Sequence, residues 1–192
     1  MPDDDRELML RARSGSREAF DELVRRWQGR LVGFFHRQCG DRELAEDCTQ
    51  EVLVRLYRSR GRYQPTARFA TFLFTIARNH WIDVARAREV RPDLRATGSG
   101  EAEPGEDRMM RLPSKEAPPP AQALLSDDVT RLRAALARLP VPLREVVQLG
   151  VIEGIPYADV SSMLSIPVGT VKSRVHAAVH ALRTLLSRGD ER

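Results

Sequence analysis

The sequence predicts an all-α protein of two small helical domains, joined by a flexible linker rich in proline, glycine and acidic residues. Apolar residues recur at steps of three and four in residues 5–90 and again in 124–188, as on one face of a helix. Residues 91–123 lack this periodicity, and six of the twelve prolines lie within 91–121. No segment shows a convincing two-residue alternation of a strand, and a helix-turn-helix is expected in the second domain.

In the first domain we predict a helix over residues 5–38. Ser16 can cap within this segment, and the apolar positions that follow it at helical spacing are Phe20, Leu23, Val24, Trp27, Leu31, Phe34 and Phe35. Further along we expect a break at 39–41, a helix over 42–57, a loop over 59–65, and one long helix or two abutting helices over 68–88.

In the second domain, Asp127 or Asp128 is the expected N-cap of a helix, whose apolar stripe is Val129, Leu132, Leu136 and Leu139. Prolines at 140 and 142 then break the chain. The next helix is predicted over 143–153 and should end at Gly154, because glycine readily adopts the left-handed conformation of a helix terminus.

A helix-turn-helix is predicted over residues 155–186. Pro156 suits the first position of a short helix, Pro167 breaks it, and Thr170 can cap the longer helix that follows. One face of the longer helix is apolar (Val171, Val175, Ala178, Val179, Leu182, Leu185, Leu186), and its flank carries Lys172, His176, His180 and Arg183. Residues 168–188 contain no acid. This pattern favours a helix that enters the DNA major groove over a solvated basic helix in an ordinary bundle.

The formal net charge of +4 is small, so any nucleic-acid surface must come from the segregation of charge along the chain. The N-terminal residues are acidic and polar, and no apolar run approaches the ~18 residues of a membrane span, which predicts a cytoplasmic protein without a membrane span. Cys39 and Cys48 allow a disulfide, a metal pair or buried thiols, and a reducing cytosol favours buried thiols.

Motifs for catalysis are absent from the sequence, which has no glycine-rich dinucleotide or phosphate loop and no zinc-protease motif. Asp47 and Glu51, four residues apart, could in principle hold a divalent metal, but this spacing more often marks a solvated or partner-facing acidic patch. We therefore expect no enzyme activity, catalytic residue, metal, cofactor or small-molecule substrate.

Four stretches resemble the extracytoplasmic-function group of bacterial sigma factors, of the sigma-70 family. Residues 154–164 (GIPYADVSSML) and 166–178 (IPVGTVKSRVHAA) are similar to its C-terminal promoter-binding domain. Residues 47–52 (DCTQEV) resemble its helix for binding RNA polymerase core, and 69–86 (FATFLFTIARNHWIDVAR) its segment that opens the −10 element. The resemblance implies a sigma region 2-like domain over 5–90 and a region 4-like domain over 124–188, which read −10 and −35 respectively.

Within the second helix of the helix-turn-helix, residues near the N-terminus should reach base edges in the −35 duplex. Thr170, Ser173, His176 and Ala177 lie on that side, where Ser173 and His176 can hydrogen-bond to bases and Ala177 can touch a thymine methyl group. The candidates for phosphate contacts are Lys172, Arg174 and Arg183.

In the first domain, the resemblance implies that the −10 strand is captured near residues 63–86. Basic residues suit the backbone and polar ones suit flipped bases, and the candidates are Arg78, Asn79, His80, Asp83 and Arg86, with Tyr63 and Arg68 beside a base pocket. Most aromatics at helical spacing should instead be core. Asp47, Gln50 and Glu51 form a ridge of acceptors that is expected to bind polymerase core.

The expected partners are RNA polymerase core, promoter DNA and, by resemblance, an anti-sigma factor. Ala87 stands where the family usually carries a second arginine, and His176 and Ala177 stand where it carries bulky or basic residues, so the promoter sequence stays open. Two alternatives are a helix-turn-helix transcriptional regulator that binds DNA without polymerase core, and a nucleic-acid enzyme. The first would need a receiver or ligand domain and the second a catalytic constellation.

Overall fold

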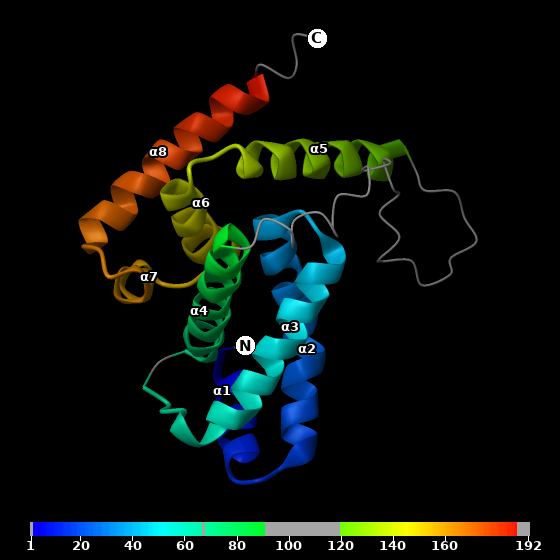
Figure 1. The fold of residues 1–192 in the computed structure, drawn as a ribbon, viewed down its shortest axis with the longest axis vertical. Coiled ribbons are helices and arrows are strands. Elements are labelled where there is room, and N and C mark those ends of the chain that lie inside the picture. Colours follow the sequence, from blue (N-terminus) through cyan, green and yellow to red (C-terminus); the bar gives the residue numbers. More distant parts are fainter. Residues whose placement is uncertain (1, 67, 91–119, 188–192) are drawn as a thin grey trace.

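The computed structural model describes residues 2–66, 68–90 and 120–187. All regular secondary structure in these residues is helical, which confirms the predicted all-α class (Figure 1). The predicted linker over 91–123 lies outside the described residues, apart from residues 120–123, which belong to a helix. No helix in the described ranges is long and apolar enough to cross a membrane.

The first half of the chain is a bundle in which α2, α3 and α4 pack side by side and α1 packs against α2 (Figure 1). Its elements are α1 (Pro2–Arg13), α2 (Arg17–Cys39), α3 (Arg42–Ser59), a short 3₁₀ turn η1 (Arg60–Arg62) and α4 (Phe69–Val90).

The single helix predicted over 5–38 is wrong, because the structure has two helices there. Gly15 has a φ of 103°, in the left-handed region, and this reverses the chain between α1 and α2. Ser16 is the N-cap of α2, and its hydroxyl accepts a hydrogen bond from the Ala19 N–H at 3.2 Å. The predicted cap is therefore real, but it starts a new helix.

The break predicted at residues 39–41 is confirmed, and each residue has a role in it. Gly40 ends α2 with a φ of 71°, and its N–H donates to the carbonyl of His36. Asp41 caps α3 by accepting from the Leu44 N–H at 3.2 Å. The Cys39 thiol donates to the backbone carbonyls of Phe35 and Asp41.

An aromatic cluster fills the centre of the first bundle. Trp27 lies edge-on to Phe69 and Phe74, with ring centroids 5.4 and 6.1 Å apart, and Phe34 contacts both Phe74 and Phe35. Aromatic pairs in this geometry stabilise a core beyond the area they bury. The prediction that most aromatics at helical spacing belong to the core holds for these five.

The second half contains α5 (Pro120–Ala137), α6 (Val141–Val147), a π-helical turn η3 (Gln148–Ile152), α7 (Tyr157–Leu164) and α8 (Val168–Ser187). Helix α5 begins before Asp127 and Asp128, so the predicted N-cap there is wrong. Leu136 and Leu139 are buried as expected, whereas Val129 and Leu132 are exposed. Gly154 is left-handed, with a φ of 68°, as predicted.

The helix-turn-helix consists of α7, a three-residue turn and α8 (Figure 1). Ser165 ends α7 in the left-handed conformation, at a φ of 53°, and the Ile166 N–H donates to the Ser161 carbonyl. The carbonyl of Pro167 accepts from the N–H groups of Thr170 and Val171. Helix α8 therefore begins before Thr170, and the prediction that Thr170 is the cap is wrong.

The two halves also pack against each other. One continuous apolar cluster contains the buried side chains of α1 to α4 together with Val146, Leu149, Ile155, Val160 and Val171 from the second half. A smaller cluster joins α5, α6 and α8 around Leu136 and Ala178. The sequence predicts separate apolar faces for the two halves, and the structure adds the contact between them.

Candidate nucleic-acid and polymerase interfaces

Helix α8 presents a basic face that is free of acidic side chains. Val171 and Ala178 are buried against the rest of the second half, which turns the opposite face to solvent. The exposed side chains include Lys172, Ser173, His176, Ala177 and Arg183, while Thr170 and Arg174 are half-buried. The seven predicted −35 residues therefore lie on or beside one accessible surface of α8. Thr170 is at the N-terminal edge of this surface.

Two contacts of the basic face of α8 bear on how it can bind DNA. The Ser173 hydroxyl donates to the Thr170 carbonyl at 3.1 Å, so it must rotate to reach a base. Within the described residues, no ion pair involves Lys172, Arg174 or Arg183. Their charges are therefore available to phosphates.

Most residues predicted to hold the −10 strand lie on helix α4. The structure places some of them on an exposed face and others in contacts with the rest of the protein. Asn79, Asp83 and Arg86 lie on one exposed face at spacings of four and three. Arg68 is exposed just before the helix. Arg78 points another way: its Nε lies 3.3 Å from the carboxylate of Glu145 on α6, and both side chains are largely buried.

Tyr63 and His80 are not on this exposed face. Tyr63 is fully buried and lies edge-on to Phe69 and Phe72, so its ring cannot stack on a base in this structure. His80 is 8% exposed and lies edge-on to Phe35, 6.1 Å away. Both predictions are therefore corrected, because these side chains contribute to the core.

His80 makes the stability of the first half sensitive to acid. Burial lowers its pKa, and Arg55 lowers it further, while Glu51 and Asp83 oppose the shift. Because the folded pKa lies below the ordinary value of about 6.5, the unfolded chain binds the proton first. Stability should therefore fall as pH drops below about 6.5, and His80→Gln should reduce the fall in melting temperature between pH 7 and pH 5.

His36 provides a comparison for this prediction, because burial also lowers its pKa. We expect His36→Gln to reduce the acid sensitivity as well, and the double variant to reduce it more than either single change. Thermal melting followed by circular dichroism at each pH gives the measurement. An unchanged pH dependence in both single variants would contradict the assignment.

On α3, Asp47 and Gln50 are exposed and Glu51 is half-exposed, and they lie along one face. Glu51 accepts a hydrogen bond from Arg55 at 2.7 Å, which lowers its pKa, and Arg55 also lies 3.5 Å from Asp83 on α4. Glu51 is therefore ionised at neutral pH. No group of three metal-ligating side chains occurs within the described parts of the chain.

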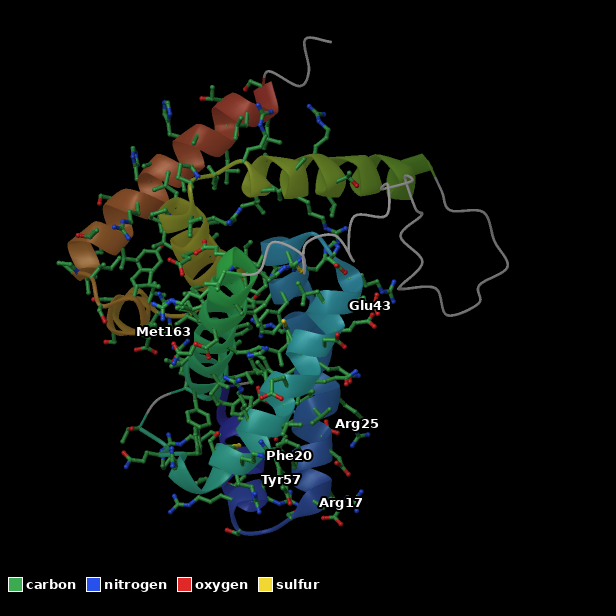
Figure 2. The ribbon with its side chains drawn as sticks, viewed as in Figure 1. Arg17, Phe20, Arg25, Glu43, Tyr57 and Met163 are labelled. Carbon is green, nitrogen blue, oxygen red and sulfur yellow. The ribbon has the colours of Figure 1, made fainter. Side chains whose placement is uncertain are left out.

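An apolar groove lies beside this ridge and was not predicted. It has a volume of about 390 Å³ and is lined by Phe20, Val24, Gln50, Leu53, Val54, Tyr57 and Arg58. Phe20 and Tyr57 meet edge-on across it, from α2 and α3, with ring centroids 5.0 Å apart (Figure 2). Val54 and Tyr57 are exposed by 42% and 47%. An exposed apolar surface with a polar rim is typical of a protein-binding site.

Both cysteines are free. Cys48 is buried on α3, and burial raises its pKa to about 11. Burial also raises the pKa of Cys39. The prediction of buried thiols is confirmed for Cys48, whereas Cys39 is only partly buried. A thiol with a raised pKa forms little of the reactive thiolate.

Comparison with known proteins identifies a family match in each half of the chain. Residues 23–91 match the family described as Sigma-70 region 2, and residues 130–182 match Sigma-70, region 4. The chain is 33% identical to the RNA polymerase sigma-H factor of Pseudomonas aeruginosa, over 93% of this chain and 91% of that protein. It is also 33% identical to the sigma factor CarQ of Myxococcus xanthus, over 93% and 95%.

Similarity extends to solved structures and to proteins named for the group. The ECF sigma factor SigE of Mycolicibacterium smegmatis is 33% identical over 88% of this chain and 62% of that protein. The structure of CnrH in complex with the cytosolic domain of CnrY has a TM-score of 0.65 at 25% identity and covers 96% of this chain and 98% of that one. The chain belongs to the extracytoplasmic-function group of the sigma-70 family. It is an alternative sigma factor that directs promoter-specific transcription by RNA polymerase, and the alternative of a regulator acting without polymerase is not favoured.

Proposed function

We propose that the two helical halves divide the work of promoter recognition, with residues 124–188 reading the −35 duplex and residues 5–90 binding polymerase core and the −10 strand. The observation that carries this division is the position of α8. Its apolar back is held by the second half, so its acid-free face is free to enter a major groove. The protein acts in the cytoplasm, where polymerase and promoters are, and does no covalent chemistry itself.

Within the −35 surface, we assign different tasks to neighbouring side chains. His176 and Ala177 are exposed near the N-terminal half of α8 and face the bases together with Ser173. Lys172, Arg174 and Arg183 lie around them and hold phosphates. Thr170 supports the N-terminal edge of this surface.

Two substitutions separate these tasks. Arg174→Ala should weaken binding to all promoters alike and reduce the slope of log affinity against log salt concentration by about one unit. His176→Ala should instead change the preferred −35 sequence, by about 1–3 kcal/mol at one or two positions. Transcription from a randomised −35 library with purified core, at two salt concentrations, measures both. If His176→Ala keeps the original preference while Arg174→Ala alters it, the two roles are assigned the wrong way round.

For the −10 element, the exposed face of α4 provides polar and basic groups in a row. Asn79 and Asp83 can hydrogen-bond to the edges of unstacked bases, while Arg86 and Arg68 hold the backbone of the same strand. Arg78 can join them only if its ion pair with Glu145 opens.

For polymerase core, the ridge of Asp47, Gln50 and Glu51 and the adjoining apolar groove form one surface. The carboxylates can receive arginine side chains, and Phe20 and Tyr57 add the apolar contact that an interface needs at its centre. An anti-sigma factor is the further partner we propose. The structural relative CnrH was solved in complex with the cytosolic domain of CnrY, and this complex supports the proposal.

A further inference from the structure

Arg55 of α3 connects the ridge proposed for polymerase core to the exposed face of α4. Its Nε lies 2.7 Å from the carboxylate of Glu51, one helical turn earlier on α3, and its Nη1 lies 3.5 Å from Oδ2 of Asp83 on α4. Helices α3 and α4 pack side by side, so the second contact crosses the boundary between them (Figure 1). The guanidinium therefore reaches the face proposed for the −10 strand from a neighbouring helix.

The guanidinium of Arg55 is held from two sides. Glu51 binds Nε, which is the inner nitrogen of the planar group, while Nη1 faces Asp83. Planar guanidinium groups can contact two carboxylates with separate nitrogen atoms, whereas a lysine ammonium has no such fixed fork. Burial and, after it, Arg55 lower the pKa of the nearby His80, so this imidazole is neutral at pH 7 and Arg55 supplies the positive charge beside Asp83.

The carboxylate of Asp83 lies in the middle of the face proposed for DNA. Asp83 follows Asn79 by four positions and precedes Arg86 by three, so a strand that contacts both of these residues passes over it. An uncompensated carboxylate at this place would repel the phosphates of the strand. Among the ion pairs of the described residues, Arg55 is the only partner of Asp83. Arg55 therefore offsets a charge that would otherwise oppose binding.

The contact with Arg55 also determines which oxygen of Asp83 is left for a base. Oδ2 faces Arg55, so Oδ1 remains for a further hydrogen bond. An ionised carboxylate accepts hydrogen bonds and donates none. Adenine, cytosine and guanine each carry an exocyclic amino group that can donate to it, whereas thymine has carbonyl oxygens in the corresponding places. Asp83 in this orientation favours a base with an amino group over thymine.

We propose that Arg55 is a positioning residue for recognition of the −10 element: it holds the Asp83 carboxylate so that Oδ1 accepts a hydrogen bond from the exocyclic amino group of one unstacked base. This rests on the proposed role of the α4 face in holding the −10 strand. Arg55 acts through Asp83 and does not itself read the base. Because the pair is exposed to solvent, it contributes little to stability, and its loss changes the choice of base more than the fold.

The test uses the full-length chain with purified core and a library of promoters in which only the −10 element is randomised. Four variants are compared with the original protein: Arg55→Ala, Arg55→Lys, Asp83→Asn, and Arg55→Ala combined with Asp83→Asn. All promoters compete for the same holoenzyme in one reaction. Their relative use therefore does not depend on how tightly a variant binds core, which separates this test from any effect of Arg55 on Glu51.

Arg42→Ala is the matched control on the same helix. Arg42 pairs with Glu46 at the same four-residue separation and is also exposed, but its ion pair does not reach α4. Arg42→Ala and Arg55→Ala each remove exposed ion pairs, so the two variants should melt within a few degrees of each other when followed by circular dichroism. Only Arg55→Ala should change the use of −10 sequences.

We expect Asp83→Asn to increase the use of thymine at one −10 position by about threefold to tenfold, the effect of one hydrogen bond. Arg55→Ala should change the preference at the same position and in the same direction. The double variant should differ no more from the original than Asp83→Asn does, because Arg55 acts through Asp83. Arg55→Lys keeps the charge without the planar fork, so it should retain part of the original preference.

If Asp83→Asn changed the preference and Arg55→Ala did not, the positioning role would be overturned while the proposed function stood. Effects of the two changes at different positions, or effects that add in the double variant, would overturn it in the same way. An unchanged preference in Asp83→Asn would overturn both the base-reading role of Asp83 and the role of Arg55. If Arg55→Ala did not fold, Arg55→Lys would decide by the same comparison at the same position.

Discussion

The double variant Asp47→Ala with Glu51→Ala should bind polymerase core about 2–4 kcal/mol more weakly than the original protein, a loss of roughly 30-fold to 1000-fold. Charged side chains that become buried and hydrogen-bonded in an interface have effects of this size when they are removed. Both side chains lie on the outer face of α3. Among the residues that the structure describes, the only ion pair that these substitutions remove is the exposed one between Glu51 and Arg55. An exposed pair contributes at most about 1 kcal/mol, so the fold should survive.

The control for this variant is Glu7→Ala with Glu89→Ala, which removes the same charge from exposed sites on α1 and α4. It should bind core as the original protein does, apart from a small general effect of net charge. Co-purification or titration with core measures both variants, after circular dichroism has shown that they are folded. Equal core affinity of the two double variants would rule out the ridge as the docking surface.

Phe74→Ala should lower the free energy of unfolding by about 3–5 kcal/mol, the cost of truncating a fully buried phenylalanine. The Phe74 side chain is fully buried, and its ring lies 6.1 Å from Trp27 and 5.3 Å from Phe34. The surrounding rings cannot collapse into the space without losing their own contacts. Urea denaturation measures the loss, and a marginal domain could unfold altogether.

Tyr57→Ala is the comparison for this prediction, since Tyr57 is 47% exposed on the groove beside the ridge. It should change stability by no more than about 1 kcal/mol and instead weaken core binding. The folded fraction of Phe74→Ala should keep the original −10 preference, because its ring does not reach solvent. A changed −10 preference with normal stability would show that Phe74 contacts DNA.

The parts of the fold that were predictable are those with a local signal. The cap at Ser16, the break at residues 39–41 and the left-handed residue Gly154 follow from the chemistry of the local residues alone. The helix boundary at Gly15 was missed because apolar residues continue at helical spacing on both sides of it. The start of α5 was missed because propensity favoured the acidic cap at 127–128 over a proline-rich start.

The candidate sites were likewise predictable only where the sequence has a local signal. The face of α8 was predictable because an acid-free run and an apolar stripe occur in one helix. Tyr63 was misplaced because a loop residue has no periodicity to show whether it is buried. The groove was missed because Phe20 and Tyr57 come from different helices, and each looks unremarkable in its own segment. Glu153 pairs with Arg30 and Arg37 of α2, and the Gln148 amide donates to the Phe34 carbonyl. These partners are more than 110 positions apart in the sequence, so no local pattern could indicate the contact.

The π-helical turn η3 determines which residues of the second half can face α2. The Glu153 N–H donates to the Gln148 carbonyl, five residues back, at 2.9 Å. In an α-helix, side chains five positions apart differ in direction by about 140°, so Gln148 and Glu153 could not both point at the same neighbour. The wider turn brings them back to one side.

The number of residues in this turn therefore sets the direction of the helices that follow it. Deleting one residue between Gln148 and Glu153 would leave them four positions apart, and ordinary α-helical winding would then also place them on one side of the helix. Deleting a second residue there would turn everything beyond it by about 100° and re-aim the helix-turn-helix without touching any of its DNA-facing side chains. Among relatives of this chain, a spacing of four or five positions between these two polar residues is thus a simple marker of which proteins can pack their second half on α2 in the same way.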